Sequence, residues 1–284
     1  MAFVDGIHIA VNEHRADNPA LLIAFPGITE PKESIEAFAL GIIEHLERVD
    51  LAAVDLYAQG ESGGEWDLHA MIRGFGKLID RYAESYERII LMGHSAGGII
   101  AANASIDCRI AGMVIINAPA RPQEAVPAWF LKHAHAFPPQ VLEAGVKAYE
   151  LYHRLTNGDY RSQVDAESND LGVVGMRIGD PSAFLERLQD APGLVDAAQR
   201  VTAPTLFVYG ANQPEFGIRD GVLNASTRGT IERWNAHTDV SIIPGADHNL
   251  NDETWPGKWF NTDEHHAWVR DDIARWIRTR LTWP

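Results

Sequence analysis

One serine and one histidine in this chain have the surroundings that nucleophilic catalysis requires. Ser95 is the third residue of the turn Gly-His-Ser-Ala-Gly at positions 93–97. A serine hydroxyl is a weak nucleophile near neutral pH, so it needs a base within hydrogen-bond reach, a group that orients the base, and donors for the oxyanion. Of the twelve histidines, only His248 lies in the loop directly after the last expected strand, in Pro-Gly-Ala-Asp-His at 244–248. These residues predict acyl chemistry with Ser95 as nucleophile and His248 as base.

Two backbone N–H groups are the expected donors to the oxyanion. The N–H of Ala96 comes directly after the nucleophile. The second donor should come from the turn after an early strand, where Pro26 and Gly27 precede Ile28. Gly27 allows the chain to bend back, so we expect the N–H of Ile28 to complete the oxyanion hole. The alternative is an ordinary Pro-Gly turn without a catalytic role.

The elements that position these residues follow from the alternation of short apolar runs with amphipathic segments. Runs that are nearly continuous in apolar residues are typical of strands covered on both faces. Predicted strands are Ile7 to Val11, Leu21 to Phe25, Leu51 to Val54, Ile89 to Met92, Met113 to Ile116, Thr205 to Tyr209 and Val240 to Ile243. Helical spacing of apolar residues follows at 35–46, at 68–82, from 96 onward and at 269–277, the last after Thr262 as candidate N-cap. Strand then helix, repeated, predicts an α/β fold with a mostly parallel central sheet and helices on both faces.

The segment at 120–199 departs from this alternation. It carries helical patterns, several prolines and aromatic residues such as Trp129, but no convincing strand. We therefore predict a helical cap subdomain at 120–199, inserted before the last strands, above a core formed by 1–119 and 200–284. The alternative is that the segment only covers the sheet.

The motifs together resemble those of the α/β-hydrolase superfamily, in its capped, esterase-like branch. The segments that carry the resemblance are GHSAGG, FPGI in place of the usual His-Gly oxyanion turn, VDLYAQGES, APTLFVYGANQPE and IPGADH. They are spread over nearly all the chain outside the expected cap. The resemblance implies an α/β-hydrolase fold, a Ser-His-acid triad, an acyl-enzyme intermediate and no cofactor. It says little about the substrate, which the shape of the cap decides.

The position of the triad acid departs from the family pattern. After the strand that matches Thr205 to Tyr209, the family usually carries Gly-x-x-Asp, whereas here the fourth residue is Gln213. Glutamine can accept a hydrogen bond from the ring of His248 but does not stabilise an imidazolium by charge. In serine proteases, replacing the triad acid by its amide costs about 10⁴ in kcat, or roughly 5.5 kcal/mol.

Three interpretations of the acid position follow. In the preferred one, Glu215 takes the role from the same loop. In the second, an acid from another loop, such as Glu124 or Asp180, reaches His248. In the third, the triad works without a formal acid, which suits weaker hydrolysis or chemistry other than hydrolysis. Asp247 adjoins the histidine, but successive side chains tend to point apart.

Aromatic residues provide candidates for substrate binding, whereas no metal site is expected. Trp255 and Trp259 follow His248 closely and, with Trp129 of the expected cap, could form the wall of a small to medium, largely apolar acyl pocket. Equally, the two tryptophans after His248 could cover an exposed part of the sheet. The pairs at 133 and 135 and at 265 and 266 are histidines that do not share a helix face, and no carboxylate cluster completes a site.

Composition limits the classes of partner. The net charge of −15, from 39 acidic residues against 24 Lys and Arg, disfavours nucleic-acid backbones and anionic membrane surfaces. The single cysteine, Cys108, excludes an intrachain disulfide. The first residues lack a secretory pattern, and no stretch approaches about 18 consecutive apolar residues. We therefore expect a cytoplasmic protein with a small-molecule substrate and with neither nucleic acid nor membrane as partner; a homodimer is compatible with the sequence.

Three functions remain open at this point. The first is hydrolysis of a small to medium carboxylic ester or thioester through an acyl-enzyme on Ser95. The second keeps the fold but performs acyl transfer, cyclisation, C–C bond hydrolysis or lyase chemistry, which the glutamine at 213 motivates. The third is a non-catalytic ligand receptor, in which Ser95 and His248 would be idle. The resemblance argues against epoxide hydrolase and haloalkane dehalogenase chemistry, because those relatives carry aspartate at the nucleophile turn.

Overall fold

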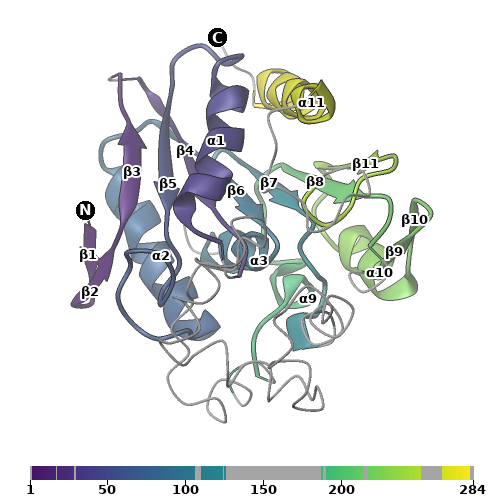
Figure 1. The fold of residues 1–284 in the computed structure, drawn as a ribbon, viewed down its shortest axis with the longest axis horizontal. Coiled ribbons are helices and arrows are strands. Elements are labelled where there is room, and N and C mark those ends of the chain that lie inside the picture. Colours follow the sequence, from purple (N-terminus) through teal and green to yellow (C-terminus); the bar gives the residue numbers. More distant parts are fainter. Residues whose placement is uncertain are drawn as a thin grey trace, which may run out of the picture.

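A seven-stranded sheet forms the centre of the molecule (Figure 1). The computed structural model describes residues 2–16, 18–28, 30–105, 110–123, 125, 187, 190–213, 217–250 and 264–281. The sheet strands are β3 (Val11–His14), β4 (Ala20–Phe25), β5 (Val49–Val54), β6 (Arg88–His94), β7 (Gly112–Ile116), β8 (Thr205–Gly210) and β11 (Thr238–Ile243). Their order is β11-β8-β7-β6-β4-β5-β3, and all neighbours are parallel except the edge strand β3, which is antiparallel to β5. Two antiparallel hairpins lie outside the sheet: β1 (Ala2–Val4) with β2 (Ile7–Ile9), and β9 (Ile218–Arg219) with β10 (Val222–Leu223).

Helices cover both faces of the sheet. Those that the structure describes are α1 (Lys32–Ile43), α2 (Leu68–Ala83), α3 (Ala96–Ala104), α9 (Leu194–Ala197), α10 (Ala225–Glu232) and α11 (Glu264–Arg280). On one face α1 packs against α11, and on the other α2 packs against α3 (Figure 1). Within the described residues, none of these helices combines the length and the apolar character that a bilayer crossing requires.

The sequence of β4 explains why both faces are covered. All six of its residues are buried and apolar. Odd-numbered residues such as Ile23 belong to the core beneath α2 and α3, and even-numbered residues such as Leu22 belong to the core beneath α1 and α11. Because successive side chains of a strand point to opposite faces, a continuously apolar strand contributes to two cores at once.

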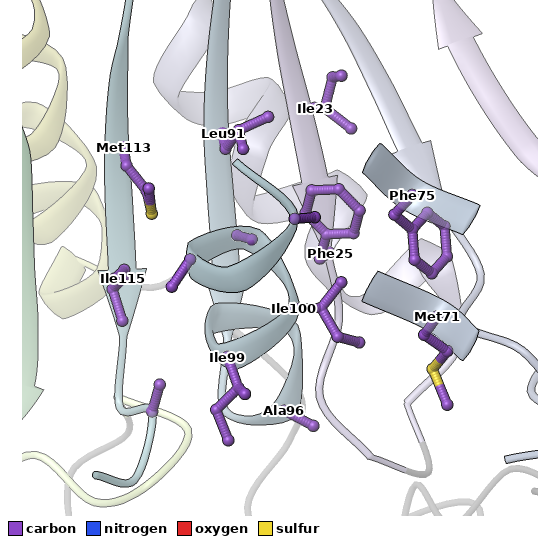
Figure 2. Packing of buried hydrophobic residues seen from close by; sticks show 14 of the residues in the cluster. Ile23, Phe25, Met71, Phe75, Leu91, Ala96, Ile99, Ile100, Met113 and Ile115 are labelled. Carbon is purple, nitrogen blue, oxygen red and sulfur yellow. The ribbon is translucent and has the colours of Figure 1, made fainter. Parts of the chain in front are cut away.

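The helix after β6 is short and entirely buried, because α3 lies against the middle of the sheet. Figure 2 shows Ile99 and Ile100 of this helix among side chains from the sheet and α2. Phe25 and Phe75 meet edge to face there, with ring centroids 5.2 Å apart. A Cβ on Gly97 would collide with backbone oxygens at the end of β4, so only glycine lets the helix approach this closely.

The predicted α/β architecture is confirmed, but one of the predicted strands corresponds to two separate strands. The run Ile7 to Val11 is not one strand but two, β2 and β3, which pair with different partners. The break lies at Ala10, whose N–H donates to the hydroxyl of Ser62 at 2.8 Å instead of joining a strand ladder. Sequence periodicity does not reveal this break, because four of the five residues from 7 to 11 are apolar and the fifth is His8.

The predicted cap range of 120–199 lies largely outside the described residues, which omit 124, 126–186 and 188–189. The described end of that range, 190–199, contains α9. Ala191 and Leu194 from this end belong to the same core as α2 and α3, and Gly193 accepts a hydrogen bond from the side chain of Asn103 at 3.1 Å.

The carboxyl ends of the parallel strands form one continuous edge of the sheet. The chain leaves β4 for β5 on one side and then returns to β6 on the other side of β4. In open α/β sheets such a switch in strand order opens a crevice at the carboxyl ends, where ligands bind. Register places Phe25 beside Gly93, and Ile243 beside Gly210. Loops that start near residues 26, 95, 117, 211 and 244 therefore leave the same edge.

Candidate active site

Ser95 occupies the turn between β6 and α3 in an unusual backbone conformation. Its φ is 52° and its ψ is −118°, a region that non-glycine residues rarely adopt and that is often found at functional sites. The N–H of Ser95 donates to the carbonyl of Ile116 at 2.8 Å, which ties the turn to the neighbouring strand. A Cβ on Gly93 would collide with the backbone at Gly97, so the turn requires a small residue there.

The loop after β4 is held by two side chains that sequence reasoning did not single out. The carboxylate of Glu30 accepts the N–H of Gly27 at 2.7 Å. The amide nitrogen of Gln59 donates to the carbonyls of Gly27 at 3.1 Å and of Glu30 at 3.2 Å. Among the described residues, no acceptor receives the N–H of Ile28 or of Ala96. Ile28 follows the carboxyl end of β4 and Ala96 follows that of β6, so both expected oxyanion donors lie at the same edge of the sheet.

His94, the residue before the nucleophile, forms a buried ion pair with Glu30. Its Nδ1 lies 2.9 Å from a carboxylate oxygen of Glu30, and its Nε2 lies 2.8 Å from the carbonyl oxygen of His248. Because both ring nitrogens face acceptors, the geometry favours the imidazolium form of His94. Burial acts to lower the pKa of His94, but the charge of Glu30 and the hydrogen bonds outweigh it, and the pKa is raised. The pair thus joins the loop after β4, the end of β6 and the loop that carries His248.

His248 is hydrogen-bonded to Gln213. Nδ1 of the histidine lies 3.0 Å from Oε1 of the glutamine, which is fully buried. The amide nitrogen of Gln213 donates to Oδ1 of Asn117 at 2.5 Å and to the carbonyl of Gly210 at 2.9 Å. Since the nitrogen faces two acceptors, the amide oxygen is the atom that faces His248. Nδ1 of His248 is therefore the donor, which leaves Nε2 of the neutral ring as an acceptor.

Asn117 holds the loop that carries the histidine. It follows β7 directly, with a φ of 48°, and is fully buried. Its amide nitrogen donates to the carbonyl of His248 at 2.7 Å and to that of Asp247 at 3.3 Å. Its Oδ1 accepts the N–H of Gly210 at 2.8 Å in addition to the amide of Gln213. One side chain therefore positions both the base and its hydrogen-bond partner.

The comparison with known families agrees with this geometry. Residues 36–258 match the model of the alpha/beta hydrolase family. The chain belongs to that family. The match includes Ser95, Gln213 and His248 but begins after the oxyanion loop at 26–30, where this hydrolase carries Pro-Gly instead of the usual His-Gly.

Solved structures of α/β hydrolases match almost the whole chain. Est1E from Butyrivibrio proteoclasticus, bound to ferulic acid, has a TM-score of 0.60 and 17% identity, and the match covers 98% of each chain. The hydrolase GrgF from Penicillium sp. sh18 has a TM-score of 0.68 and 16% identity over 99% of this chain and 97% of that one. A monoacylglycerol lipase from Paleococcus ferrophilus has a TM-score of 0.61 and 14% identity, covering 98% of this chain and all of the other. These identities show the fold alone, and no curated protein sequence matches this hydrolase.

The predicted site residues are only partly within the described residues of this hydrolase. Ser95, Gln213, His248, Ile28 and Ala96 all lie at the carboxyl edge of the sheet. Outside the described residues lie Glu215, Glu124, Asp180, Trp129, Trp255 and Trp259. Around the described site and elsewhere in the described residues, no three His, Cys, Asp or Glu side chains gather as a metal site would require.

Besides Gln59, sequence reasoning did not identify three polar residues of the site, Glu30, His94 and Asn117. His94 and Asn117 stand at the carboxyl end of predicted strands, and Glu30 is five residues beyond one. A polar residue just after a buried parallel strand is the signal that could have found them, because that edge is where α/β folds bind ligands. The neighbouring Asp247, in contrast, is turned to its own loop, where its carboxylate accepts the N–H of Asn249 at 2.8 Å.

Proposed function

We propose that this α/β hydrolase is a serine hydrolase that cleaves small to medium carboxylic esters or thioesters through an acyl-enzyme on Ser95. The observation that carries the proposal is the arrangement at one sheet edge: a serine on a strained turn, and a histidine whose Nδ1 lies 3.0 Å from the amide oxygen of Gln213. The names of Est1E, with its bound ferulic acid, and of the monoacylglycerol lipase support an ester as the first substrate class to test.

The proposed reaction uses the described groups in sequence. Oγ of Ser95 attacks the carbonyl carbon while Nε2 of His248 takes the hydroxyl proton. The oxyanion of the tetrahedral intermediate accepts hydrogen bonds from the N–H groups of Ile28 and Ala96. His248 then gives its proton to the departing alkoxide or thiolate. Water then attacks the acyl-enzyme carbonyl while His248 takes its proton. His248 returns this proton to Oγ of Ser95 as the acid is released. The N-terminus of α3, which begins at Ala96, favours the developing negative charge.

We propose Gln213, rather than Glu215, as the third member of the triad. Its amide oxygen is the acceptor for the Nδ1 hydrogen of His248 at 3.0 Å. A neutral amide orients the ring and selects its tautomer but does not offset the charge of the imidazolium. Orientation and the oxyanion hole therefore carry a larger part of the rate than in a triad with a carboxylate.

The neutral partner of His248 also supports a second candidate function. Acyl transfer, cyclisation and lyase reactions do not require His248 to activate water, whereas C–C bond hydrolysis keeps water as the final acceptor. In the acyl-transfer form of this candidate, the acyl group on Ser95 is passed to an acceptor other than water. Product analysis by mass spectrometry, with an alcohol added as a competing acceptor, separates the two: an excess of the transfer product over the free acid favours the second candidate.

The acyl pocket remains a prediction. Trp129, Trp255 and Trp259 are the residues that we propose as its walls, together with a cap formed by residues within 120–199. Their replacement by alanine should raise KM for longer acyl chains more than for acetyl esters if they contact the acyl group.

A serine-directed probe tests the proposed function. We expect a fluorophosphonate to label the wild-type protein and nitrophenyl esters of short acids to be hydrolysed. Both activities should be lost in Ser95→Ala. Ser105→Ala is the matched control, because Ser105 is also buried, stands at the other end of α3 and has a hydroxyl that donates to the carbonyl of Ala102 at 2.8 Å. Absence of labelling and of turnover in folded wild-type protein would contradict the proposal.

A further inference from the structure

The side chain of Gln213 occupies a position whose surroundings fit an amide and not a carboxylate. Its nitrogen faces two acceptors, Oδ1 of Asn117 at 2.5 Å and the carbonyl of Gly210 at 2.9 Å. Its oxygen faces one donor, Nδ1 of His248 at 3.0 Å. The residue is fully buried, so solvent does not supply alternative partners. Each end of the amide therefore has the partner of opposite hydrogen-bonding type.

We propose that Asn117 is the positioning residue that keeps the amide oxygen of Gln213 turned toward His248. The inference rests on the proposed roles of Ser95 and His248. An amide beside a histidine can be turned either way. With its nitrogen toward Nδ1, the neutral ring would carry its hydrogen on Nε2 and could not accept the proton of Ser95. In serine proteases, the change of triad aspartate to asparagine costs about 10⁴ in kcat through this wrong tautomer.

Asn117 can fix the orientation because its own amide has no freedom to turn. Its Oδ1 accepts the backbone N–H of Gly210 at 2.8 Å, and its nitrogen donates to the backbone carbonyls of His248 at 2.7 Å and Asp247 at 3.3 Å. Turning the side chain would set donor against donor and acceptor against acceptor. The backbone thus fixes Asn117, Asn117 fixes Gln213, and Gln213 fixes the tautomer of His248.

The same contacts indicate that the site is not simply an acid triad that has lost its carboxylate. A glutamate at position 213 would place one carboxylate oxygen against Oδ1 of Asn117 and the carbonyl of Gly210, both of which are acceptors. That oxygen must then hold a proton, which raises the pKa of the carboxyl group, or move away from both neighbours. We therefore expect a carboxylate at this position to bring no increase in rate, although the carboxylate is the usual residue of the family.

The test reads the tautomer of His248 directly. Nitrogen-15 NMR distinguishes a protonated from an unprotonated ring nitrogen, and the signals of His248 are assigned by their absence in His248→Gln. We expect the wild-type protein at neutral pH to carry hydrogen on Nδ1. In Asn117→Ala the amide of Gln213 is free to turn, so we expect a mixture of tautomers and a fall in kcat on the order of 10²-fold to 10⁴-fold, with little change in KM.

Asn235→Ala is the matched control. The amide nitrogen of Asn235 also donates to two backbone carbonyls, those of Val201 at 3.3 Å and Ala203 at 2.7 Å, and its Oδ1 accepts the N–H of His237 at 2.8 Å. These residues precede β8 and β11 and so lie at the opposite edge of the sheet. Asn235→Ala should lose stability as Asn117→Ala does, while its tautomer and kcat stay at wild-type values.

Gln213→Glu gives a second reading that does not depend on the folding of Asn117→Ala. We expect it to show no gain in kcat and a melting temperature that falls from about pH 5 to about pH 8, because a carboxyl whose folded pKa is raised loses stability as it ionises. A gain in kcat with full stability at the higher pH overturns the proposal, as does a wild-type His248 protonated on Nε2. The NMR result is independent of turnover. The expected tautomer in a protein without ester hydrolysis supports the role of Asn117 and rejects the proposed function.

Discussion

Two polar networks meet at the backbone carbonyl of His248, and they differ in charge. From one side Nε2 of His94 donates at 2.8 Å, as part of an ion pair with Glu30. From the other side the amide of Asn117 donates at 2.7 Å, as part of a neutral chain with Gln213. All four of these residues are at most 2% exposed. The buried carboxylate of Glu30 therefore holds the loop after β4, and the amide of Gln213 contacts the ring of His248.

This difference indicates where a buried charge is tolerated near a catalytic histidine. The charge of the Glu30 and His94 pair stays constant during the proposed reaction, because neither residue exchanges a proton with the substrate. The charge of His248 changes at each step, and its partner Gln213 remains neutral throughout. The ion pair therefore contributes to the structure of the site, whereas the neutral chain contributes orientation. Three experiments test this distinction.

The largest effect is expected for Glu30→Gln. The replacement removes the charge that balances the His94 imidazolium in a fully buried place, and breaking such a pair costs about 3 to 5 kcal/mol. Urea denaturation followed by circular dichroism measures this loss. Glu33→Gln is the control, since the side chain of Glu33 is 57% exposed and its pair with Lys32 should contribute little. Equal losses of unfolding free energy in the two variants would show that the buried pair of Glu30 contributes no more than an exposed salt bridge.

The pH dependence of stability gives a smaller and more specific effect. Because the folded pKa of His94 is raised above its ordinary value of 6.5, its contribution to stability is complete below that pH. The contribution is lost as the pH rises through the folded pKa. We therefore expect the difference in unfolding free energy between wild type and Glu30→Gln to shrink as the pH rises from 6.5 through the folded pKa of His94. A difference that stays constant over this range would show that His94 is neutral in the fold.

The smallest effect is expected for Asp239→Asn, which changes a charged network outside the site. Asp239 accepts hydrogen bonds from Trp276 at 2.8 Å and Arg280 at 2.8 and 2.9 Å, and the side chains of Asp239 and Arg280 are 32% and 50% exposed. Partial burial raises the pKa of Asp239, but these donors outweigh it and the pKa is lowered. Its contribution, present above pH 3.8 and lost below, should stay under about 1 kcal/mol. A loss as large as that of Glu30→Gln would show that burial does not separate the two networks.

The fold and the two central residues of the site could be predicted because their signals are local. Continuous apolar runs predict the sheet strands β4, β5, β6, β7, β8 and β11, and small residues around Ser95 predict the turn between β6 and α3. His248 follows from its place after the last strand. In each case a few neighbouring residues determine the backbone geometry, so a single sequence contains the information.

The supporting residues could not be predicted, because their partners are distant in the sequence. Glu30 meets His94 across 64 residues, and Asn117 meets His248 across 131. Gln213 departs from the family pattern, and the prediction of Glu215 follows from the rule that a triad needs an acid; Glu215 lies outside the described residues. What favours the glutamine is the carbonyl of Gly210 and Oδ1 of Asn117, and the orientation of such groups follows from tertiary structure alone.

The distances in sequence between the partners also bear on how the proposed site assembles during folding. The carbonyl of His248 accepts hydrogen bonds from residues 154 and 131 positions earlier, and its loop follows β11, the last strand of the sheet along the chain. Contacts of such long sequence separation form slowly, since the chain must lose loop entropy before they are made. A refolding chain that has formed β4 to β7 but has not docked β8 and β11 has a nucleophile without a base. Recovery of activity therefore reports complete assembly of the sheet, and not the earlier formation of its centre.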